Sequence, residues 1–454
     1  MYRSLISLMP KAQPLLLDLY PNAAVAYSLR KLRSSYTGNA IRVRRTSDNA
    51  EQDFGFNSSG DLDVNSIENF VGYNLTNWSE DLTQTAWSKP NSTIGGTLIN
   101  DPLGVASARV AFETTAGATH GITKAVTGVG GNTYTVSFWL KSQGRDNVRI
   151  TTSTGLNSRQ AWLNLATGTI VSQPSPFVNL TISSAGNGWY LVSFTEVAAN
   201  ATLQTIFNFS PDGSTITYVG DVTKGVAIWG LQITESSTVR PYRQTLAIAE
   251  GDGRVSRFFD QSGNGNNATQ SSPSSQAQIV INGNIIIDTT TLKPTTTWTA
   301  DSYGLINGVN PNTRYLSVSV NTRLTINDQI LHLGTTNNPG TVNGQQSLRW
   351  RGSDGLIQSF RHTQSSHGLI TTNGSYIIMS EKDSNNLKSV SINGFVNSSG
   401  TEVPANGTFM NQFGRSSAVA ATTAQYQEFI YWDSEQSANR ANIETLINDY
   451  YGIF

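Results

Sequence analysis

Short runs of alternating apolar and polar residues recur along most of the chain, and they constrain its fold more than any other feature. The clearest run, TYTVSFWLK at 133–141, directs its large apolar side chains to one face of an extended strand. Turn residues separate such runs. The Asn-Gly steps at Asn282 and Asn393 are the strongest short signal for a β-hairpin. The pattern therefore predicts an all-β protein of sandwich or jelly-roll type, with a few short helices.

Composition agrees with this prediction and excludes several classes of protein. Only 13% of the residues are charged and 40 are glycine, which argues against coiled coils and charged disordered chains. The absence of cysteine removes disulfide scaffolds, zinc ribbons and thiol nucleophiles. The net charge of -1 argues against a nucleic-acid partner, and no apolar run is long enough to predict a membrane span. We interpret MYRSLISLMPKAQP as an ordinary mature N-terminus rather than a signal peptide.

Three segments carry helical signals. Asn22 is placed to cap a helix whose apolar residues recur at spacings of four, three and four before Gly38 ends it. A second helix is predicted over 63–71, where Asn65 and Glu68 have capping-box spacing. A third is predicted over 437–451. Between the first two, IRVRR reads as a short strand.

Two further segments, AYSLRKLRSSYTGNAIRVRRTSDNAEQDFGF (26–56) and FFDQSGNGNNATQ (258–270), go beyond a general β pattern. Together they resemble the catalytic-domain fold of arabinofuranosidase-B-type glycosidases, a concanavalin-like sandwich. The same pair is similar to motifs of many bacteriophage virion proteins. The final segment, 432–454, resembles the C-terminus of those phage proteins.

The two motifs normally lie close together in that group, but here a long β-rich stretch separates them. This stretch, from NLTNWSEDLTQTAWSK to VAIWGLQITESSTVRPYRQT, resembles the carbohydrate-binding jelly-roll module of phage tail and fibre proteins. We therefore predict a discontinuous concanavalin-like sandwich of residues 1–73 and 245–454, with a jelly-roll domain inserted as 74–244. Insertion is tolerated where two chain ends lie close together on an exposed loop.

The second motif contains a G-x-G-x-x-A pattern, which is typical of dinucleotide binding. The following TQSSPSS cannot begin a helix, so no helix N-terminus is available for a pyrophosphate. We predict a tight structural loop instead, in which short polar side chains bond to nearby backbone amides. The predicted loop residues are Asp48, Asn49, Asp260, Ser262 and Asn264.

No metal or cofactor is predicted. Asp61-Leu62-Asp63 begins like a calcium loop, but Ser66 and Gly72 stand where glycine and a bidentate glutamate are needed. The four histidines, His120, His332, His362 and His367, are not spaced as metal ligands. A Ca²⁺ ion held by oxygen ligands elsewhere stays an open alternative.

Glycoside hydrolysis requires two carboxyl groups about 5–5.5 Å or 6.5–9.5 Å apart. None of the outer-domain candidates can be paired from spacing: Asp301, Asp354, Glu381, Asp383, Glu402, Glu428 and Asp433. The glycosidases that the chain resembles also carry a vicinal cysteine pair, which is absent here. We therefore predict no catalytic residues and no enzymatic role. The alternatives are a hydrolase or depolymerase acting on host-surface polysaccharide, and a purely architectural protein.

Carbohydrate binding suits the aromatic, Asn-rich composition, because a sugar presents its C–H face to an aromatic ring and its hydroxyls to amide groups. Trp139 lies on the polar face of its predicted strand, and the other candidates lie in segments rich in turns or polar residues. The predicted sugar-binding residues are Trp139, Trp162, Trp87 and Trp298. Core packing is the competing interpretation of each ring.

Residues 1–50 carry eight basic residues against two acidic ones. One interpretation is a docking face for an acidic capsid or tail surface, and the other is the solvated side of a helix and a strand. The predicted attachment residues are Arg30, Lys31, Arg33, Arg42, Arg44 and Arg45. The resemblance implies a virion location as a head fibre, capsid decoration, tail fibre or spike. It also implies other virion proteins and host-surface glycans as partners, and a homo-oligomer, most simply a trimer.

Overall fold

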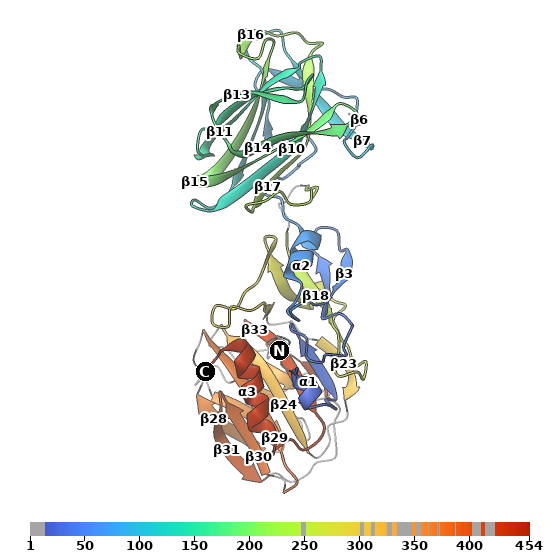
Figure 1. The fold of residues 1–454 in the computed structure, drawn as a ribbon, viewed down its shortest axis with the longest axis vertical. Helices are drawn as coiled ribbons and strands as arrows, with labels where there is room; N and C mark the ends of the chain where they lie inside the picture. The colour runs from blue at the N-terminus through green and yellow to red at the C-terminus, as the bar shows by residue number, and fades with distance from the viewer. Residues whose placement is uncertain are drawn as a thin grey trace, which may run out of the picture. The chain divides into compact units, whose positions relative to one another are not determined.

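The computed structural model describes residues 14–246, 251–299, 304–309, 314–324, 329–333, 347–350, 356–361, 363–369, 371, 373–385, 387–401, 410–413 and 423–454. The chain forms two compact units (Figure 1). The outer unit comprises Met1–Val71 and Asp252–Phe454, and the inserted unit comprises Gly72–Gly251. The boundaries between the two units lie after residues 71 and 251. The predicted domain boundaries lie after residues 73 and 244.

The inserted unit is built from antiparallel strands that share one long member. These are β4 (Trp87–Ser88), β5 (Ser92–Ile94), β6 (Ile99–Asn100), β7 (Ala106–Glu113), β8 (Gly117–Thr119), β9 (Gly121–Thr127), β10 (Thr133–Gln143), β11 (Asn147–Leu156), β12 (Gln160–Asn164), β13 (Thr169–Ser175), β14 (Val178–Gly186), β15 (Trp189–Ser210), β16 (Thr217–Val219) and β17 (Gly225–Glu235).

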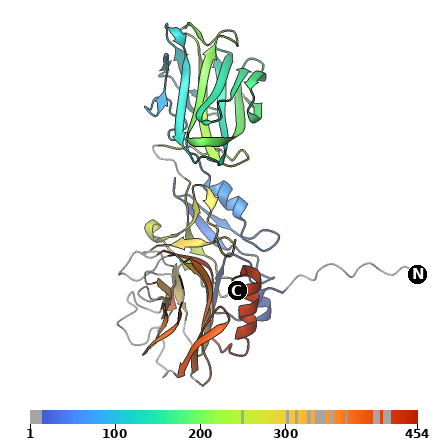
Figure 2. The same ribbon diagram turned by 90° about the vertical axis from the view of Figure 1, so that its left-hand side faces the viewer.

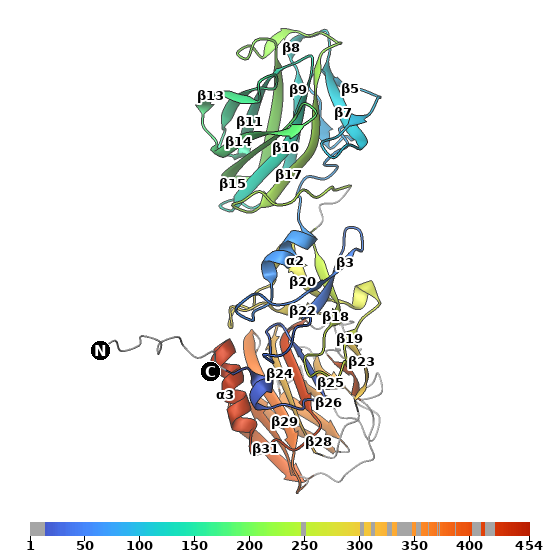
Figure 3. The same cartoon turned by 45° about the vertical axis from the view of Figure 1, so that its right-hand side comes forward.

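Strand β15 belongs to both layers of the inserted unit. Its first part pairs with β10 and β14, whereas its second part pairs with β11 and β9 (Figure 3). Apolar side chains that alternate along β10, such as Val136 and Phe138, meet those of β11 and β15 in the core between the layers. The alternating pattern at 133–141 thus forms the predicted strand, and the prediction of an all-β, sandwich-type fold is confirmed.

The two ends of the inserted unit are joined to each other by hydrogen bonds. The Asn74 side-chain amide donates to the carbonyl oxygens of Leu231 (3.0 Å) and Arg243 (3.1 Å). The backbone amide of Thr245 donates to the Ser79 hydroxyl at 2.9 Å. The incoming and outgoing segments therefore lie side by side within this unit.

Within the described residues, the outer unit contains three α-helices, one 3₁₀ turn and the remaining strands. They are β1 (Val25–Ser28), β2 (Ile41–Arg45), β3 (Glu51–Phe54), β18 (Gly253–Phe258), β19 (Ala268–Thr269), β20 (Ala277–Ile281), β21 (Asn284–Ile285), β22 (Thr296–Trp298), β23 (Gly304–Val309), β24 (Tyr315–Arg323), β25 (Gln329–Leu333), β26 (Ser347–Trp350), β27 (Leu356–Arg361), β28 (Thr363–Leu369), β29 (Gly374–Lys382), β30 (Leu387–Ile392), β31 (Phe395–Thr401), β32 (Met410–Phe413), β33 (Ala424–Trp432), α1 (Leu16–Leu19), α2 (Val64–Val71), α3 (Arg440–Tyr451) and η1 (Pro273–Ser275).

These strands form one strongly curled antiparallel sheet in which β24 lies between β29 and β33. Helix α3 covers one face of this sheet (Figure 2), where its Ile443 and Ile447 join a core cluster with Val318 and Val320 of β24. A second core cluster collects the aromatic side chains of the other face. Within the described residues, no helix is both long and apolar enough to cross a membrane.

The structure confirms two of the three predicted helices. Helix α2 occupies 64–71, although its first turn is capped by Asp63 rather than Asn65, because the Asp63 carboxylate accepts the Ser66 amide at 3.2 Å. Helix α3 ends at Gly452, whose φ of 62° is the left-handed conformation that glycine adopts readily. The IRVRR segment forms β2, as predicted.

The helix predicted to begin at Asn22 is wrong. Residues 25–28 form strand β1, which pairs with β33 and is buried along its whole length. Both faces of this strand lie in apolar surroundings, so its sequence lacks the alternation of a half-exposed strand. The apolar residues of this segment therefore recur at the spacing expected of a helix, although the segment forms a strand.

Both predicted Asn-Gly hairpins are present. Asn282 and Gly283 have φ of 49° and 76° and join β20 to β21. Asn393 and Gly394 have φ of 49° and 82° and join β30 to β31. Positive φ at both central residues is the requirement of a type I′ turn.

Candidate functional site

One outward-facing row of side chains crosses four neighbouring strands of the inserted unit. The register of β12, β11, β15 and β9 places Trp162, Arg149, Asn208 and Gly121 beside one another in that order. The neighbours of Arg149 along β11, Val148 and Ile150, are buried in the core, so the alternation of the strand turns Arg149 outward.

The guanidinium of Arg149 is fixed against this sheet. Its Nε and Nη2 donate to Oδ1 of Asn208 at 3.3 Å and 2.8 Å. Its central carbon lies 5.8 Å from the centroid of the Trp162 ring, within the range of a cation–π contact. Contacts on two sides thus hold the charged group in one orientation.

A second row runs parallel to the first, two residues further along each strand. It consists of the partly exposed side chains of Gln160, Thr151, Ile206 and Thr123. In the first row, a Cβ on Gly121 would lie only 2.0 Å from the Phe207 carbonyl oxygen, so this position requires glycine. We call the two rows together the polar face. It presents the guanidinium of Arg149, the amide of Gln160 and the hydroxyl of Thr123, groups that bond sugar hydroxyls and ligand oxygens. The Thr151 hydroxyl oxygen is buried, and Asn208 is only 4% exposed.

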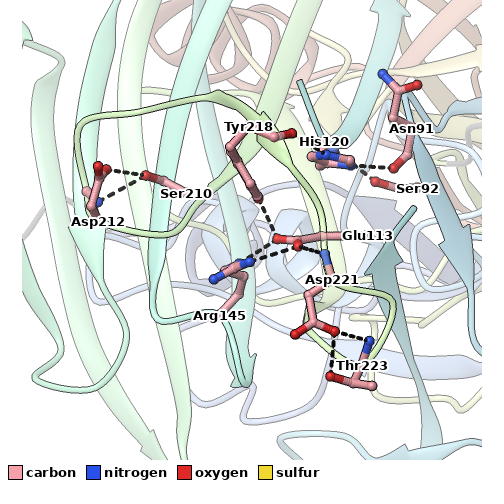
Figure 4. Close-up of polar contacts among 12 residues, drawn as sticks. Asn91, Ser92, Glu113, His120, Arg145, Ser210, Asp212, Tyr218, Asp221 and Thr223 are labelled. Atoms are coloured by element: carbon pink, nitrogen blue, oxygen red, sulfur yellow. Dashed lines mark hydrogen bonds and ion pairs between the residues drawn. The ribbon is translucent and has the colours of Figure 1, made fainter. Parts of the chain in front are cut away.

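A separate polar cluster surrounds the buried carboxylate of Glu113 in β7 (Figure 4). Glu113 accepts hydrogen bonds from Arg145 Nε at 2.5 Å and Arg145 Nη2 at 2.9 Å. It also accepts the Asp221 amide at 2.9 Å and the hydroxyl of Tyr218. These contacts connect β7 and β16 to the loops that follow β10 and β16.

The charges in this cluster favour a structural role over proton transfer. Burial would raise the pKa of Glu113, but the hydrogen bonds from Arg145, Asp221 and Tyr218 hold that pKa below its ordinary value. Burial and the Glu113 carboxylate raise the pKa of the Tyr218 phenol. At neutral pH the carboxylate therefore stays ionised and the phenol stays protonated, and neither is poised as a general acid or base.

His120 and Asp212 hold the neighbouring loops. The buried His120 places Nδ1 2.7 Å from the Asn91 carbonyl oxygen, and Nε2 3.0 Å from that of Ala116 (Figure 4). The exposed Asp212 carboxylate accepts backbone amides of the turn that follows it, and these bonds lower its pKa. Both side chains therefore stabilise loops through hydrogen bonds to backbone groups.

The stacking role predicted for Trp87 and Trp298 is wrong, because these side chains are only 2% and 1% exposed. Their indole nitrogens donate within the protein, to the Trp78 carbonyl oxygen and the Thr296 hydroxyl respectively. Trp162 is 7% exposed, so its ring supports Arg149 and does not offer a free face to a sugar.

Trp139 is partly exposed, but its ring edges lie in an aromatic cluster. The Trp139 ring makes edge-to-face contacts with Trp229 at 5.3 Å and Tyr242 at 5.4 Å between ring centroids. The pairing of β10 with β17 has a bulge beside Trp139, and Gly230 of β17 has a φ of 64°. A Cβ on Gly230 would lie 2.9 Å from the Trp139 ring, so the glycine makes room for this indole.

The predicted loop residues of the second motif tie it to the first motif. Asp260 Oδ1 accepts the backbone amides of Ala26 and Ser262, each at 2.9 Å. The Asn264 side-chain amide donates to the carbonyl oxygen of Ala23 at 2.9 Å. In the first motif, the Asp48 carboxylate accepts the Ala50 amide at 3.0 Å.

Most of the predicted attachment residues use their charge inside the outer unit. Three form ion pairs: Arg30 with Glu428 at 2.8 Å, Arg42 with Asp53 at 2.5 Å and Arg45 with Asp48 at 2.6 Å. Arg44 is buried and donates to the side-chain oxygens of Gln276 and Asn49, both at 2.7 Å. Lys31 and Arg33 are partly exposed. The predicted docking role is therefore wrong for the buried Arg30 and Arg44, and it stays a prediction for the more exposed Arg42 and Arg45.

Of the carboxyl groups considered for hydrolysis, three have partners within the outer unit, Asp433 is partly exposed, and three lie outside the described residues. Glu428 accepts from Arg30 and Ser28, Glu381 pairs with Arg440 at 3.0 Å, and Asp383 accepts turn amides. Outside the described residues lie Asp301, Asp354, Glu402 and His362. Among the side chains that the structure describes, no group of three or more His, Asp or Glu residues is arranged to hold a metal ion.

Sequence reasoning missed Arg149, Asn208 and Gly121. The alternation along 147–156 carried a signal for the outward direction of Arg149. The partners that complete the row come from strands distant in sequence, and only the register brings them together.

No protein-family model and no curated protein matches this chain. Distant similarities to solved structures include the binding domain of botulinum neurotoxin serotype D (13% identity, TM-score 0.30, 43% of this chain and 48% of that chain). They also include the enzymatically active domain of bacteriophage CBA120 tailspike protein 4 (15%, 0.23, 35% and 21%) and Trypanosoma rangeli sialidase in complex with sialic acid (10%, 0.31, 75% and 61%). This chain spans about half the length of the first of these structures. Because these scores are low, we infer the function of the protein from the residues of this chain alone.

Proposed function

We propose that the protein is a structural protein of a bacteriophage virion that binds a host-surface glycan through the polar face of its inserted unit, without catalysis. The observation that carries the binding role is the polar face itself. Adjacent strands fix its guanidinium, amide and hydroxyl groups, and the second row is partly exposed. Groups held in place before binding lose little conformational entropy when a ligand arrives.

The virion assignment is supported by how the two resemblance motifs meet in the outer unit. Besides the Asp260 contacts, Gln261 accepts the Leu32 amide at 2.8 Å and donates to the carbonyl oxygens of Ser28 (3.1 Å) and Arg30 (3.0 Å). Segments far apart in the sequence thus form one hydrogen-bonded unit. Such contacts are expected if the chain is a phage-type sandwich into which a second domain has been inserted between the two motifs.

Binding without turnover is favoured by the state of two buried carboxylates, Glu113 and Glu428. Glu113 accepts from several donors, and Glu428 accepts from Arg30 Nε, Arg30 Nη2 and the Ser28 hydroxyl. A carboxylate occupied in this way is a poor nucleophile and a poor general acid.

The binding proposal is tested with the full chain on an array of neutral and acidic bacterial polysaccharides. The double variant Thr123→Ala/Gln160→Ala removes two hydrogen-bonding groups from the polar face, and we expect about tenfold weaker binding. Thr217→Ala, an exposed threonine outside this face, is the matched control and should bind normally. Equal binding by wild type and the double variant would contradict the proposed surface.

Three further measurements test the rest of the proposal. Incubation with each bound polysaccharide should release no new reducing ends, and their appearance would establish the hydrolase alternative. Mass spectrometry and antibody labelling of purified phage particles should place the chain on the virion. Analytical ultracentrifugation should show the homotrimer that the resemblance implies.

A further inference from the structure

Arg149 differs from several other buried or partly buried arginines of the described structure in having no acidic partner. Carboxylates lie close to the comparable residues: Arg30 with Glu428 at 2.8 Å, Arg145 with Glu113 at 2.5 Å, Arg159 with Glu196 at 3.3 Å and Arg440 with Glu381 at 3.0 Å. The fixed hydrogen-bond partner of Arg149 is a neutral amide oxygen, that of Asn208.

The electrostatics of Arg149 agree with this geometry. Burial lowers the pKa of its guanidinium, and no neighbouring charge acts in either direction. A guanidinium that loses part of its hydration without gaining a counter-charge carries an electrostatic penalty. An anionic ligand would remove this penalty, because an oxyanion forms strong charge-assisted hydrogen bonds with guanidinium donors.

The surroundings of Arg149 restrict the form of that anion. Asn208 and Trp162 hold the guanidinium from two sides, and Gly121 places no side chain at the other end of the row. The neighbouring Gln160 side chain offers an amide group rather than a further cation. A single fixed positive charge among sugar-compatible groups matches an isolated acidic substituent on a polyhydroxylated ligand better than a continuous phosphate backbone.

We infer that the polar face recognises an acidic polysaccharide, with Arg149 binding a carboxylate or sulfate group of the sugar. This inference rests on the proposed glycan-binding function and narrows its ligand to an acidic class. Arg149 supplies the charge, Asn208 orients it, and Trp162 supports it from the side.

The test measures binding of the full chain to two matched pairs of probes. Polygalacturonic acid is compared with its fully methyl-esterified form, and chondroitin sulfate with desulfated chondroitin. The first pair isolates the carboxylate and the second isolates the sulfate. We expect at least one acidic member to bind about tenfold or more tightly than its modified form, with affinity that falls as NaCl is raised.

Three variants connect this preference to Arg149. Arg149→Gln should remove the preference for the acidic probe. Asn208→Asp should remove it as well, because the new carboxylate would pair with Arg149 inside the protein while nearly preserving side-chain shape. Lys224→Gln, which removes one positive charge from a loop outside the polar face, is the matched control and should keep the preference. Unchanged far-UV circular dichroism and unfolding midpoints establish that the variants fold.

The outcomes separate the two proposals. Equal binding of acidic and modified probes, or an acid preference that survives in both Arg149→Gln and Asn208→Asp, would overturn the acidic-ligand inference and leave glycan binding intact. If neither these probes nor any polysaccharide on the array binds, both proposals fail.

Discussion

Replacing Glu113 by glutamine is expected to destabilise the inserted unit strongly. The Glu113 side chain is fully buried, and Arg145, Tyr218 and Asp221 all donate to it. A glutamine keeps one acceptor oxygen but turns an NH₂ group towards one of these donors, and it leaves the Arg145 charge without its partner. Removing one member of a buried ion pair commonly costs about 3–5 kcal/mol. Because Arg145 retains 12% side-chain exposure and can recover some hydration, we expect about 3 kcal/mol.

Urea unfolding of the full chain, followed by tryptophan fluorescence, measures this loss. Six of the nine tryptophans lie between residues 72 and 251, so the signal reports mainly on the inserted unit. With a denaturant slope of about 2 kcal/mol/M, the midpoint should fall by about 1.5 M. Arg145→Gln and the double variant complete a cycle, in which the double variant should lose less stability than the sum of the two single losses.

The pH dependence gives an independent check of the same reasoning. The folded pKa of Glu113 lies below its ordinary value, so its contribution to stability is fully present above the unfolded pKa of about 4.3. That contribution is lost as the pH falls through the folded pKa, and the wild-type and Glu113→Gln curves should converge in acid. Strictly additive losses in the cycle, or a stability difference unchanged down to acid pH, would refute the proposed ion pair.

Two further predictions concern other buried groups of the inserted unit. Burial lowers the pKa of Lys124 to about 8, so the unfolded chain binds more protons between pH 8 and 10.5 and stability should rise by about 2 kcal/mol across that range. Urea titrations should show a flatter profile for Lys124→Met. Gly230→Ala should cost about 2 kcal/mol, because the added methyl meets the Trp139 ring at 2.9 Å and φ is 64°. An unchanged near-UV circular dichroism spectrum and unfolding midpoint in Gly230→Ala would contradict this.

Local sequence patterns predicted two kinds of element: strands with only one face in the core, and tight turns. Strand β10 has one face in the core, so alternation alone identifies it. The Asn-Gly turns are equally local, because their positive φ values are a property of two residues. Strand β1 was missed because it is buried on both faces, and its environment is set by β33, about 400 residues away in sequence.

The candidate site was less accessible to sequence reasoning. Trp298 was expected to be exposed because it lies in a polar, turn-rich segment, but β22 pairs with β33 and carries the ring into the core. The arginines of residues 1–50 were predicted to be available for docking. For Arg30 this failed because its acidic partner, Glu428, lies near the other end of the sequence. The lack of an acid beside Arg149 is a property of the three-dimensional neighbourhood, and no local pattern encodes it.

The hydrogen bonds of Asn74 to Leu231 and Arg243 have a consequence for how such chains diversify. Hydrogen bonds hold the first and last segments of the inserted unit close together. For the outer unit, the insertion is therefore equivalent to a short connection rather than to a long flexible loop. Closing that connection adds little entropic burden to folding of the surrounding chain, whatever lies beyond it. Recombination at residues 71 and 251 would therefore exchange the whole inserted unit and leave the sequence of the outer unit unchanged.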